Sequence, residues 1–226
     1  MDKDVLDAIA RWPDVPAVFG WLSLTARGQW RLHPDGKATE GGPGESIQNT
    51  QIQRFINRNY TCDEQGRWFF QNGPQRVFVR LDAAPLIASV DTGNGTILSH
   101  LGETLSDITA WFIDSEGRVY FESSQGAGFV IDRDLGTLAD TLKTPEGQTL
   151  AQWWESGVGG QTEGQGVEHA KTIAQTRVSD PSGRYPVLSE TRPLTRLTDF
   201  ESVPARLGFI GNPQPPAETE LNAVSP

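Results

Sequence analysis

Three arginines in the middle of the chain stand close to aromatic or amide side chains and could bind a ligand. Arg67 precedes Trp68, Arg76 follows Asn72, and Arg118 occupies the position of Arg67 in a second copy of the same motif. A guanidinium beside an aromatic ring can bind an anionic or planar ligand through bidentate hydrogen bonds and stacking. The candidate ligand-binding residues are therefore Arg67, Trp68, Asn72, Arg76 and Arg118. The alternative, which we favour, is a structural ladder of arginines with aromatic rings and carboxylates across neighbouring strands.

The histidines and the single cysteine are the candidates for nucleophilic or acid–base chemistry. His33 and His169 fall in loops, where solvated histidines are common. His100 is expected to be partly buried, so a hydrolase that uses His100 and an acid is the enzymatic alternative. Cys62 precedes Asp63, whose charge disfavours a thiolate, and we expect a packed or half-buried thiol. We assign no catalytic residue.

Metal and cofactor sites have no complete sequence pattern in this chain. The acidic stretches at residues 91–96 and 132–134 resemble calcium loops only in part, because neither completes a twelve-residue series that ends in Glu. The glycines at 157–160 and 164–166 have no Lys and no flanking strand and helix, as a phosphate loop requires. We expect neither a metal nor a cofactor.

Bulk composition narrows the partners and the location of the protein. The formal net charge is −10 and the pI is near 4.8, so a nucleic acid is not an expected partner. One cysteine cannot form an internal disulfide. The acidic N-terminal segment lacks the apolar run of a signal peptide, and no stretch approaches 18 consecutive apolar residues. We therefore expect no membrane segment and a cytoplasmic location; the composition does not decide the oligomeric state.

A pentad of the form Asp-x-x-Gly-Arg occurs three times, at Asp63–Arg67, Asp114–Arg118 and Asp180–Arg184. A weaker copy, with Thr in place of Asp, begins at Thr25. Asp at the first position of a turn accepts hydrogen bonds from the following backbone, and Gly at the fourth tolerates a positive φ. The three acids are therefore predicted to be structural turn residues rather than paired catalytic carboxylates.

The residues around the first two pentads read as strands, and the likeness between the copies continues beyond the turns. Phe70 matches Phe121 and Phe78 matches Phe129, each at a spacing of 51 residues. Each copy is predicted to form a three-stranded antiparallel meander. Helices are expected at four places, two of them before the first meander: residues 2–11, 49–58 (with Ile52, Phe55 and Ile56 facing inward), 133–143 and 149–156. The fold class is α+β, with tandem antiparallel β-meander repeats and short helices.

The expected organisation has four parts. Residues 1–90 form an N-terminal helix and the first β-repeat, and residues 91–155 form the second β-repeat with a helix. Residues 156–212 contain a Gly-rich linker and a C-terminal β region that packs on the repeats. Residues 213–226 have the composition of a disordered tail.

The order of these elements resembles a known bacterial family, domain-of-unknown-function family 1285 (DUF1285). The matching features are Gly28-Gln-Trp30, the helix at Ile52–Ile56, Gly66–Phe70, and the strand that ends in the acidic-Ala-Pro-apolar run at 82–87. The resemblance covers roughly residues 18–140, and residues 156–226 depart from the pattern. It implies an uncharacterised bacterial family with an α+β fold of repeated motifs, and a role in signalling or ligand binding.

Together these features indicate a non-enzymatic cytoplasmic module that binds a small ligand or a protein partner. The hydrolase built on His100 is one alternative. A small β-propeller-like scaffold is the other, although helices between the copies count against it.

Overall fold

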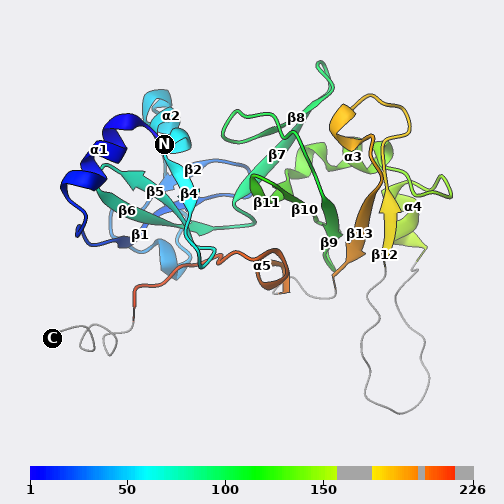
Figure 1. Ribbon diagram of the computed structural model, residues 1–226. Helices are drawn as coiled ribbons and strands as arrows, with labels where there is room; N and C mark the ends of the chain where they lie inside the picture. Colours follow the sequence, from blue (N-terminus) through cyan, green and yellow to red (C-terminus); the bar gives the residue numbers. More distant parts are fainter. Residues whose placement is uncertain (157–174, 198–201, 217–226) are drawn as a thin grey trace, which may run out of the picture. The chain divides into compact units, whose positions relative to one another are not determined.

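The computed structural model describes residues 1–156, 175–197 and 202–216 (Figure 1). The chain divides into two compact units, one of Met1–Ala83 with Phe209–Pro226 and one of Ala84–Gly208. Each unit is built on one sheet, of six strands in the first and seven in the second. The α+β class with meander repeats is therefore confirmed. Most of the predicted Gly-rich linker, His169 and the end of the predicted tail lie outside the described residues, and the predicted part boundaries stay predictions.

The sheet of the first unit has the strand order β3-β2-β1-β6-β5-β4. Strand β1 runs parallel to β6, and its other pairing, with β2, is antiparallel, so the sheet is mixed rather than a pure meander. The elements of this unit are α1 (Lys3–Arg11), β1 (Val18–Leu24), β2 (Trp30–Leu32), η1 (Ala38–Glu40), β3 (Glu45–Ser46), α2 (Thr50–Arg58), β4 (Tyr60–Cys62), β5 (Trp68–Asn72) and β6 (Gln75–Leu81).

The sheet of the second unit has the order β12-β13-β9-β10-β11-β7-β8. It is also mixed, with β11 parallel to β7 and β13 parallel to β9. The elements of this unit are β7 (Leu86–Asp91), β8 (Thr96–Ser99), β9 (Ala110–Ile113), β10 (Val119–Ser123), β11 (Gly126–Val130), α3 (Asp132–Thr141), α4 (Leu150–Glu155), β12 (Gln175–Val178), η2 (Pro186–Leu188), β13 (Arg192–Arg196) and α5 (Ser202–Leu207).

The two units repeat a five-stranded arrangement, which is larger than the predicted three-stranded meander. In each unit an antiparallel hairpin, β1-β2 or β7-β8, precedes a meander, β4-β5-β6 or β9-β10-β11. The last strand of each meander then pairs in parallel with the first strand of the hairpin. A propeller-like array of four-stranded blades does not describe these sheets, so that alternative is wrong.

The register inside the two meanders is the same, residue for residue. Phe69 pairs with Phe78 in the first unit, and Tyr120 pairs with Phe129 in the second, each 51 positions further along. The first two strands of each meander agree as well, because the pairing of Cys62 with Trp68 recurs 51 positions later as Ile113 with Val119. The matching pentads therefore fix a matching register.

Each of the first two pentads forms a hairpin turn in which Asp accepts three hydrogen bonds from within the pentad, and Asp114 accepts a fourth from the hydroxyl of Tyr120 at 3.4 Å. Oδ1 of Asp63 accepts from the backbone N–H groups of Gln65 and Arg67, at 3.0 Å each, and Oδ2 accepts from Nε of Arg67 at 2.7 Å. Gly66 has a φ of 75°, a left-handed conformation that favours glycine. The turn at Thr25 has the same backbone bonds, with the Thr hydroxyl in place of the carboxylate.

The third pentad differs from the first two. Asp180 accepts from the N–H and hydroxyl of Ser182 and from the N–H of Tyr185, but the guanidinium of Arg184 donates to the carbonyl of Thr92 instead. It joins β12 to the short helix η2 rather than to a hairpin partner. The same five letters therefore form a capped turn here without the Asp–Arg ion pair.

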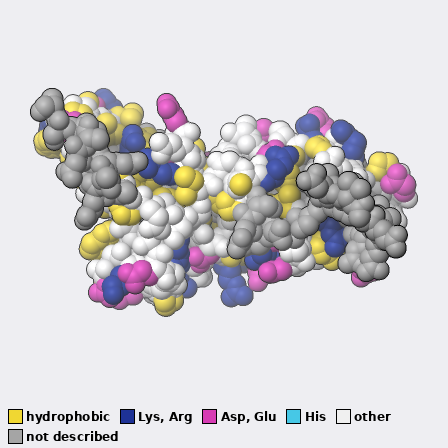
Figure 2. All heavy atoms as spheres, turned by 90° about the horizontal axis from the view of Figure 1, so that it is seen from below, with side chains coloured by type: hydrophobic (Ala, Val, Ile, Leu, Met, Phe, Trp, Pro, Cys, Tyr) yellow, Lys and Arg dark blue, Asp and Glu magenta, His cyan; other side chains and the backbone are white. Residues whose placement is uncertain are grey.

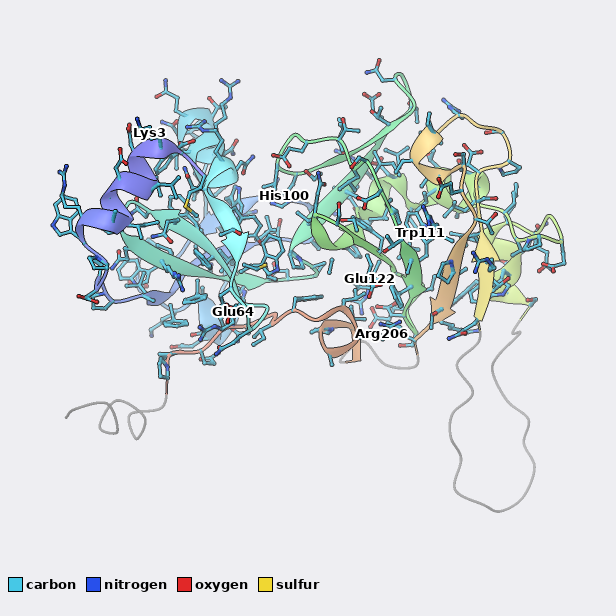
Figure 3. The ribbon with its side chains drawn as sticks, in the orientation of Figure 1. Lys3, Glu64, His100, Trp111, Glu122 and Arg206 are labelled. Atoms are coloured by element: carbon cyan, nitrogen blue, oxygen red, sulfur yellow. The ribbon has the colours of Figure 1, made fainter. Side chains whose placement is uncertain are left out.

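Large aromatic side chains form the core of the second unit. Trp111, Phe112, Tyr120 and Phe121 are each exposed by 1% or less. Each such side chain contributes roughly 1.5–3 kcal/mol through burial. Arg206 in α5 lies over the ring of Phe112, 4.7 Å from its centroid, and reaches Glu122 at 3.5 Å (Figure 3).

Candidate functional site

An apolar pocket of about 490 Å³ lies in the first unit, between one face of the sheet and helix α2. Three residues at its rim, Trp21, Leu32 and Ile52, are 44%, 42% and 48% exposed. Large apolar side chains with this much exposure are expected where a surface binds something. The lining residues come from β1, β2, α2, β5, β6 and the loop before α2: Val18, Trp21, Leu22, Leu32, Ile47, Ile52, Ile56, Phe70, Asn72, Gln75 and Val77.

A bulge in β1 opens one wall of this pocket. The parallel pairing with β6 skips from Val18 opposite Val77 to Leu22 opposite Val79, so four positions of β1 span two of β6. The chain makes this detour at Gly20, which has a φ of 81° and lies so close to the carbonyl of Gly36 that an added Cβ would overlap it. Bulges redirect side chains in this way and are common beside functional sites.

Helix α2, the opposite wall, is fixed at its N-terminal end. The side chain of Asn49 caps the helix by accepting from the N–H groups of Gln51 and Ile52. Gln53 donates from its side chain to the carbonyl of Ile47, at 2.6 Å. Ile56 is buried as predicted, whereas Ile52, also predicted to face inward, stands half exposed at the pocket rim.

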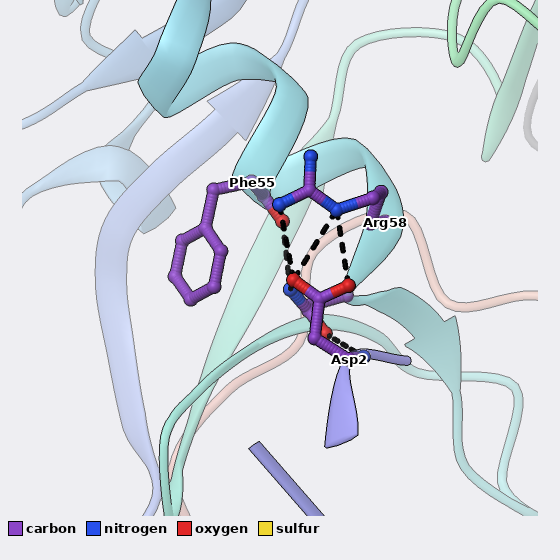
Figure 4. Close-up of polar contacts among 4 residues, drawn as sticks. Asp2, Phe55 and Arg58 are labelled. Carbon is purple, nitrogen blue, oxygen red and sulfur yellow. Dashed lines mark hydrogen bonds and ion pairs between the residues drawn. The ribbon is translucent and has the colours of Figure 1, made fainter. Parts of the chain in front are cut away.

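The C-terminal end of α2 is held by the start of α1 (Figure 4). Arg58 makes a bidentate contact with the Asp2 carboxylate, through Nε at 3.0 Å and the second guanidinium nitrogen at 3.0 Å. The side-chain amide of Asn59 bridges Asp2 and the carbonyl of Phe55. Bonds from Arg58 and then Asn59 lower the pKa of Asp2, so this tie stays ionised at neutral pH. With both ends of α2 fixed, the wall of the pocket is preformed.

The second unit packs the equivalent pair of residues differently. Val77 and Phe70 in the pocket correspond to Gly128 and Phe121, which face each other across β10 and β11. The ring of Phe121 lies directly over Gly128, where an added Cβ would overlap it, and Phe121 is fully buried. Phe70 instead turns toward α2 and packs edge-on against Phe55, with ring centroids 5.5 Å apart. The ring of Phe121 therefore takes the place that the Val77 side chain has in the first unit, whereas Phe70 lies beside the pocket.

The polar part of the pocket carries no charge. Asn72 and Gln75 face each other at the end of the β5–β6 hairpin, and they are the two polar residues among the eleven that line the pocket. The amide nitrogen of Gln75 makes one long bond, 3.2 Å, to the carbonyl of Pro16. These two carboxamides can donate and accept hydrogen bonds toward a ligand.

The structure divides the predicted ligand-binding residues between the two faces of the first sheet. Asn72 lines the pocket, and Trp68, on the same face, is buried against Tyr60. Arg67 and Arg76 lie on the opposite face, over the rings of Phe78 and Phe69, at 4.7 and 4.9 Å from the ring centroids. This is the Arg–aromatic ladder that we favoured from the sequence.

Arg118 belongs to the second unit and repeats the pairing of Arg67. Its Nε donates to Oδ2 of Asp114 at 2.7 Å. Ligand binding by Arg67, Trp68, Arg76 and Arg118 stays a prediction, because the structure shows packing contacts and ion pairs for them. Asn72 is the member of the predicted set that reaches the pocket.

A buried serine–histidine pair was not predicted. Ser23 Oγ lies 2.8 Å from Nε2 of His33, and the two residues are 0% and 5% exposed. The prediction of a solvated His33 is therefore wrong: the loop after it folds back, with Gly44 packed against the imidazole. Burial, followed by the charge of Arg80, lowers the pKa of His33. Because Ser23 is inaccessible, the pair holds the loop on the sheet rather than offering a nucleophile.

His100 also has a structural role. Its backbone N–H donates to the carbonyl of Ile87, and its Nδ1 accepts from the N–H of Ile87 at 3.2 Å. Burial lowers the pKa of His100 to about 3, so the ring is neutral at pH 7. Figure 3 shows His100 in the loop after β8. An imidazole with so low a pKa is a weak base, and its Nδ1 already accepts from Ile87, so the structure does not favour the hydrolase alternative.

The cysteine differs from expectation in its exposure. Cys62 is a free, exposed thiol at the end of β4, where a packed or half-buried thiol was predicted. Partial burial of the sulfur and the charge of Asp63 raise the pKa of this thiol. The thiolate is therefore disfavoured, as the neighbouring Asp63 predicted.

A second hollow in the first unit is polar and is largely occupied by structural bonds. Arg80 donates to the carbonyls of Ala38 and Gly42, at 2.7 and 3.1 Å, and pairs with Asp82 at 2.9 Å. It therefore anchors the loop around η1. This hollow, of about 540 Å³, is lined by Thr25, Arg31, Gly41, Gly42, Pro43, Arg80 and Asp82.

Three observations concern metals, membranes and surface charge. Among the described residues, no group of three or more His, Cys, Asp or Glu side chains is placed to hold a metal ion. Within the same ranges, none of the helices has the length and apolar character that crossing a membrane requires. On the face shown in Figure 2, Lys and Arg side chains stand among Asp and Glu side chains rather than in one basic patch.

Comparison with known proteins gives one family and two solved structures. The family model DUF2944, described as "Protein of unknown function (DUF2946)", matches residues 1–214. A DUF1285 family protein from Silicibacter pomeroyi DSS-3 is 16% identical with a TM-score of 0.41, over 60% of this chain and 76% of that chain. A DUF1285 family protein from Shewanella baltica OS155 is 13% identical with a TM-score of 0.38, over 52% and 89%. No curated protein matches.

Proposed function

This chain belongs to the family described as a protein of unknown function (DUF2946), and we propose that it binds a small apolar ligand in the pocket of the first unit. The prediction that the chain belongs to an uncharacterised family is confirmed. The observation that carries the proposal is the pocket itself, whose lining of eleven residues is apolar at nine positions. Three of these residues, Trp21, Leu32 and Ile52, are 42–48% exposed although they are large and apolar.

The size and walls of the pocket support a small molecule over a protein partner. A volume of about 490 Å³ is in the range of small-molecule sites, and its walls are nine apolar residues with two carboxamides. Burying the exposed parts of Trp21, Leu32 and Ile52 would supply the hydrophobic driving force for binding. The walls are fixed by the Asn49 cap and the Asp2–Arg58 ion pair, so little ordering would be needed.

The proposal assigns the protein a binding role, with no catalytic residue. His100 and the Ser23–His33 pair have structural bonds and lie outside the residues that line the pocket. A cytoplasmic location is part of the proposal, and cell fractionation would test it.

A titration with N-phenyl-1-naphthylamine, a neutral apolar dye whose emission rises on transfer from water, tests the proposal. We expect saturable binding to the full chain at one site. Ile52→Trp, which fills the rim of the pocket, should weaken dye binding at least tenfold. Leu6→Trp is the matched control, because Leu6 is also half exposed (51%) on a nine-residue helix but does not line the pocket. Absence of saturable binding, or equal binding by the two variants, would overturn the proposal.

A further inference from the structure

We infer that the ligand is an uncharged amphiphile, with an aliphatic or aromatic body and one hydrogen-bonding head, rather than a fatty carboxylate or an amine. This inference rests on the proposed function and specifies the chemistry of its ligand. Its basis is the placement of the two carboxamides at one end of an otherwise apolar pocket.

The lining residues separate the pocket into a body site and a head site. Ile52 and Ile56 of α2 lie across from Leu22 and Val77 of the sheet, and these aliphatic walls fit a hydrocarbon body. The head site is the end of the β5–β6 hairpin, where Asn72 and Gln75 form the last pair of the ladder. Both residues point to the pocket side because they share the face of Phe70 and Val77, at the two-residue period of a strand.

A charged head would be poorly accommodated. None of the eleven lining residues is charged, so a carboxylate or ammonium ion at this end of the pocket, where Asn72 is exposed, would stay hydrated and gain no ion pair. Arg67 and Arg76, the nearby cations of these strands, stack on Phe78 and Phe69 on the opposite face. The net charge of −10 adds a long-range repulsion for anions.

An uncharged amide or alcohol fits the head site. A carboxamide has both a donor and an acceptor, so Asn72 and Gln75 can pair with a primary amide through both of its groups. Those bonds replace some of the ones that the head makes with water. The apolar body then supplies the net affinity.

The test compares ligands of one chain length that differ only in the head. Octanamide, 1-octanol, octanoate and octylamine are each used at pH 7 to displace N-phenyl-1-naphthylamine from the full chain. We expect octanamide to displace the dye at a concentration at least tenfold lower than octanoate or octylamine, with 1-octanol between them. Equal or better displacement by octanoate or octylamine would overturn the inference while leaving the apolar site intact.

Variants of the head site make the test specific. Asn72→Leu and Gln75→Leu should keep or improve dye binding and should reduce the preference for octanamide over octanoate to less than threefold. Gln51→Leu is the control, because Gln51 is an exposed carboxamide on α2 that does not line the pocket. An unchanged preference in both head-site variants would overturn the assignment. Failure of the dye to bind the unmodified protein would instead refute the proposed function itself.

Discussion

Arg118 donates from Nε to Oδ2 of Asp114 over 2.7 Å, although the side chain of Asp114 is fully buried. The same bond in the first unit, from Arg67 to Asp63, has the same length, but the Asp63 side chain is 11% exposed. The same Asp–Arg ion pair is therefore more deeply buried in the second unit than in the first. Comparing the two units shows how burial changes the contribution of this ion pair to stability.

We predict that Asp114→Asn destabilises the protein more than Asp63→Asn. Asn keeps an acceptor for the backbone N–H groups but removes the carboxylate that the guanidinium pairs with, and this loss grows as the site becomes drier. At position 114 the change also weakens the bond from the Tyr120 hydroxyl, and Glu116, at 3.4 Å, is the anion that stays beside Arg118. The expected costs are about 2–4 kcal/mol at position 114 and about 1–2 kcal/mol at position 63. Urea unfolding, with hydrogen exchange to locate the weakened hairpin, measures both. Equal losses would show that burial does not set the energy of this pair.

The Asp63 turn also predicts a loss of stability in acid. Burial opposes the shift, but hydrogen bonds from the N–H and guanidinium of Arg67 lower the pKa of Asp63 below its ordinary value. A carboxyl whose pKa is lower in the folded state stabilises the protein above its unfolded pKa, and this contribution disappears as the pH falls through the folded pKa. Asp63→Asn should therefore lessen the acid sensitivity of the first hairpin.

The pentads were sufficient to predict the hairpins, their shared register and the α+β class, because a turn with an Asp cap and a left-handed Gly fixes the pairing of the strands on either side. They could not predict the parallel partner of each meander. The strands Val18–Leu24 and Leu86–Asp91 occupy the same place but share no sequence pattern. Their pairing is long-range and follows from the packing of the whole unit.

The site was less accessible to sequence reasoning. Asn72 was predicted as a ligand-binding residue. The pocket, however, depends on the bulge in β1 at Gly20, and this bulge is recognisable only from the contact between Gly20 and Gly36 in the folded chain. His33 was wrongly placed in solvent for a related reason: Pro and Gly indicate a loop but do not show that it folds back onto the sheet.

The close approach of Phe121 to Gly128 predicts a large effect of a single methyl group. Gly128→Ala would place its Cβ inside the ring of a fully buried phenylalanine, so we expect a cost of about 2–4 kcal/mol. Phe121→Leu alone should also destabilise, by about 1–3 kcal/mol, through lost burial. The double variant should be more stable than the sum of the two losses indicates, because the smaller side chain makes room for Cβ. Additive losses in urea unfolding would argue against this contact.

We predict that the free energy of unfolding decreases between pH 7 and pH 5 because of His100. Burial lowers its pKa to about 3 from an ordinary value of 6.5, so the unfolded chain takes up a proton that the folded protein does not. Stability is therefore fully present above about pH 6.5 and falls as the pH drops, by at most about 1.4 kcal/mol per pH unit. His100→Asn keeps an acceptor near the N–H of Ile87 and removes the titration, so its slope should be shallower. The slope that remains would include His33, whose pKa burial also lowers. An unchanged slope in His100→Asn would contradict the assignment.

Two valines of β6 provide a test that separates the pocket from the packed core. Val77 and Val79 point to the same face of the sheet, but Val77 lines the pocket and Val79 is 0% exposed and lies outside it. Val77→Phe should extend an aromatic ring into the pocket, so it should weaken N-phenyl-1-naphthylamine binding at least tenfold and leave the melting temperature unchanged or raised. Val79→Phe inserts the same ring into a closed core and should cost about 1–3 kcal/mol. Thermal unfolding followed by circular dichroism, together with the dye titration, measures both properties. If Val77→Phe were as destabilising as Val79→Phe, the space beside Val77 would not be open, and the pocket could not serve as the binding site.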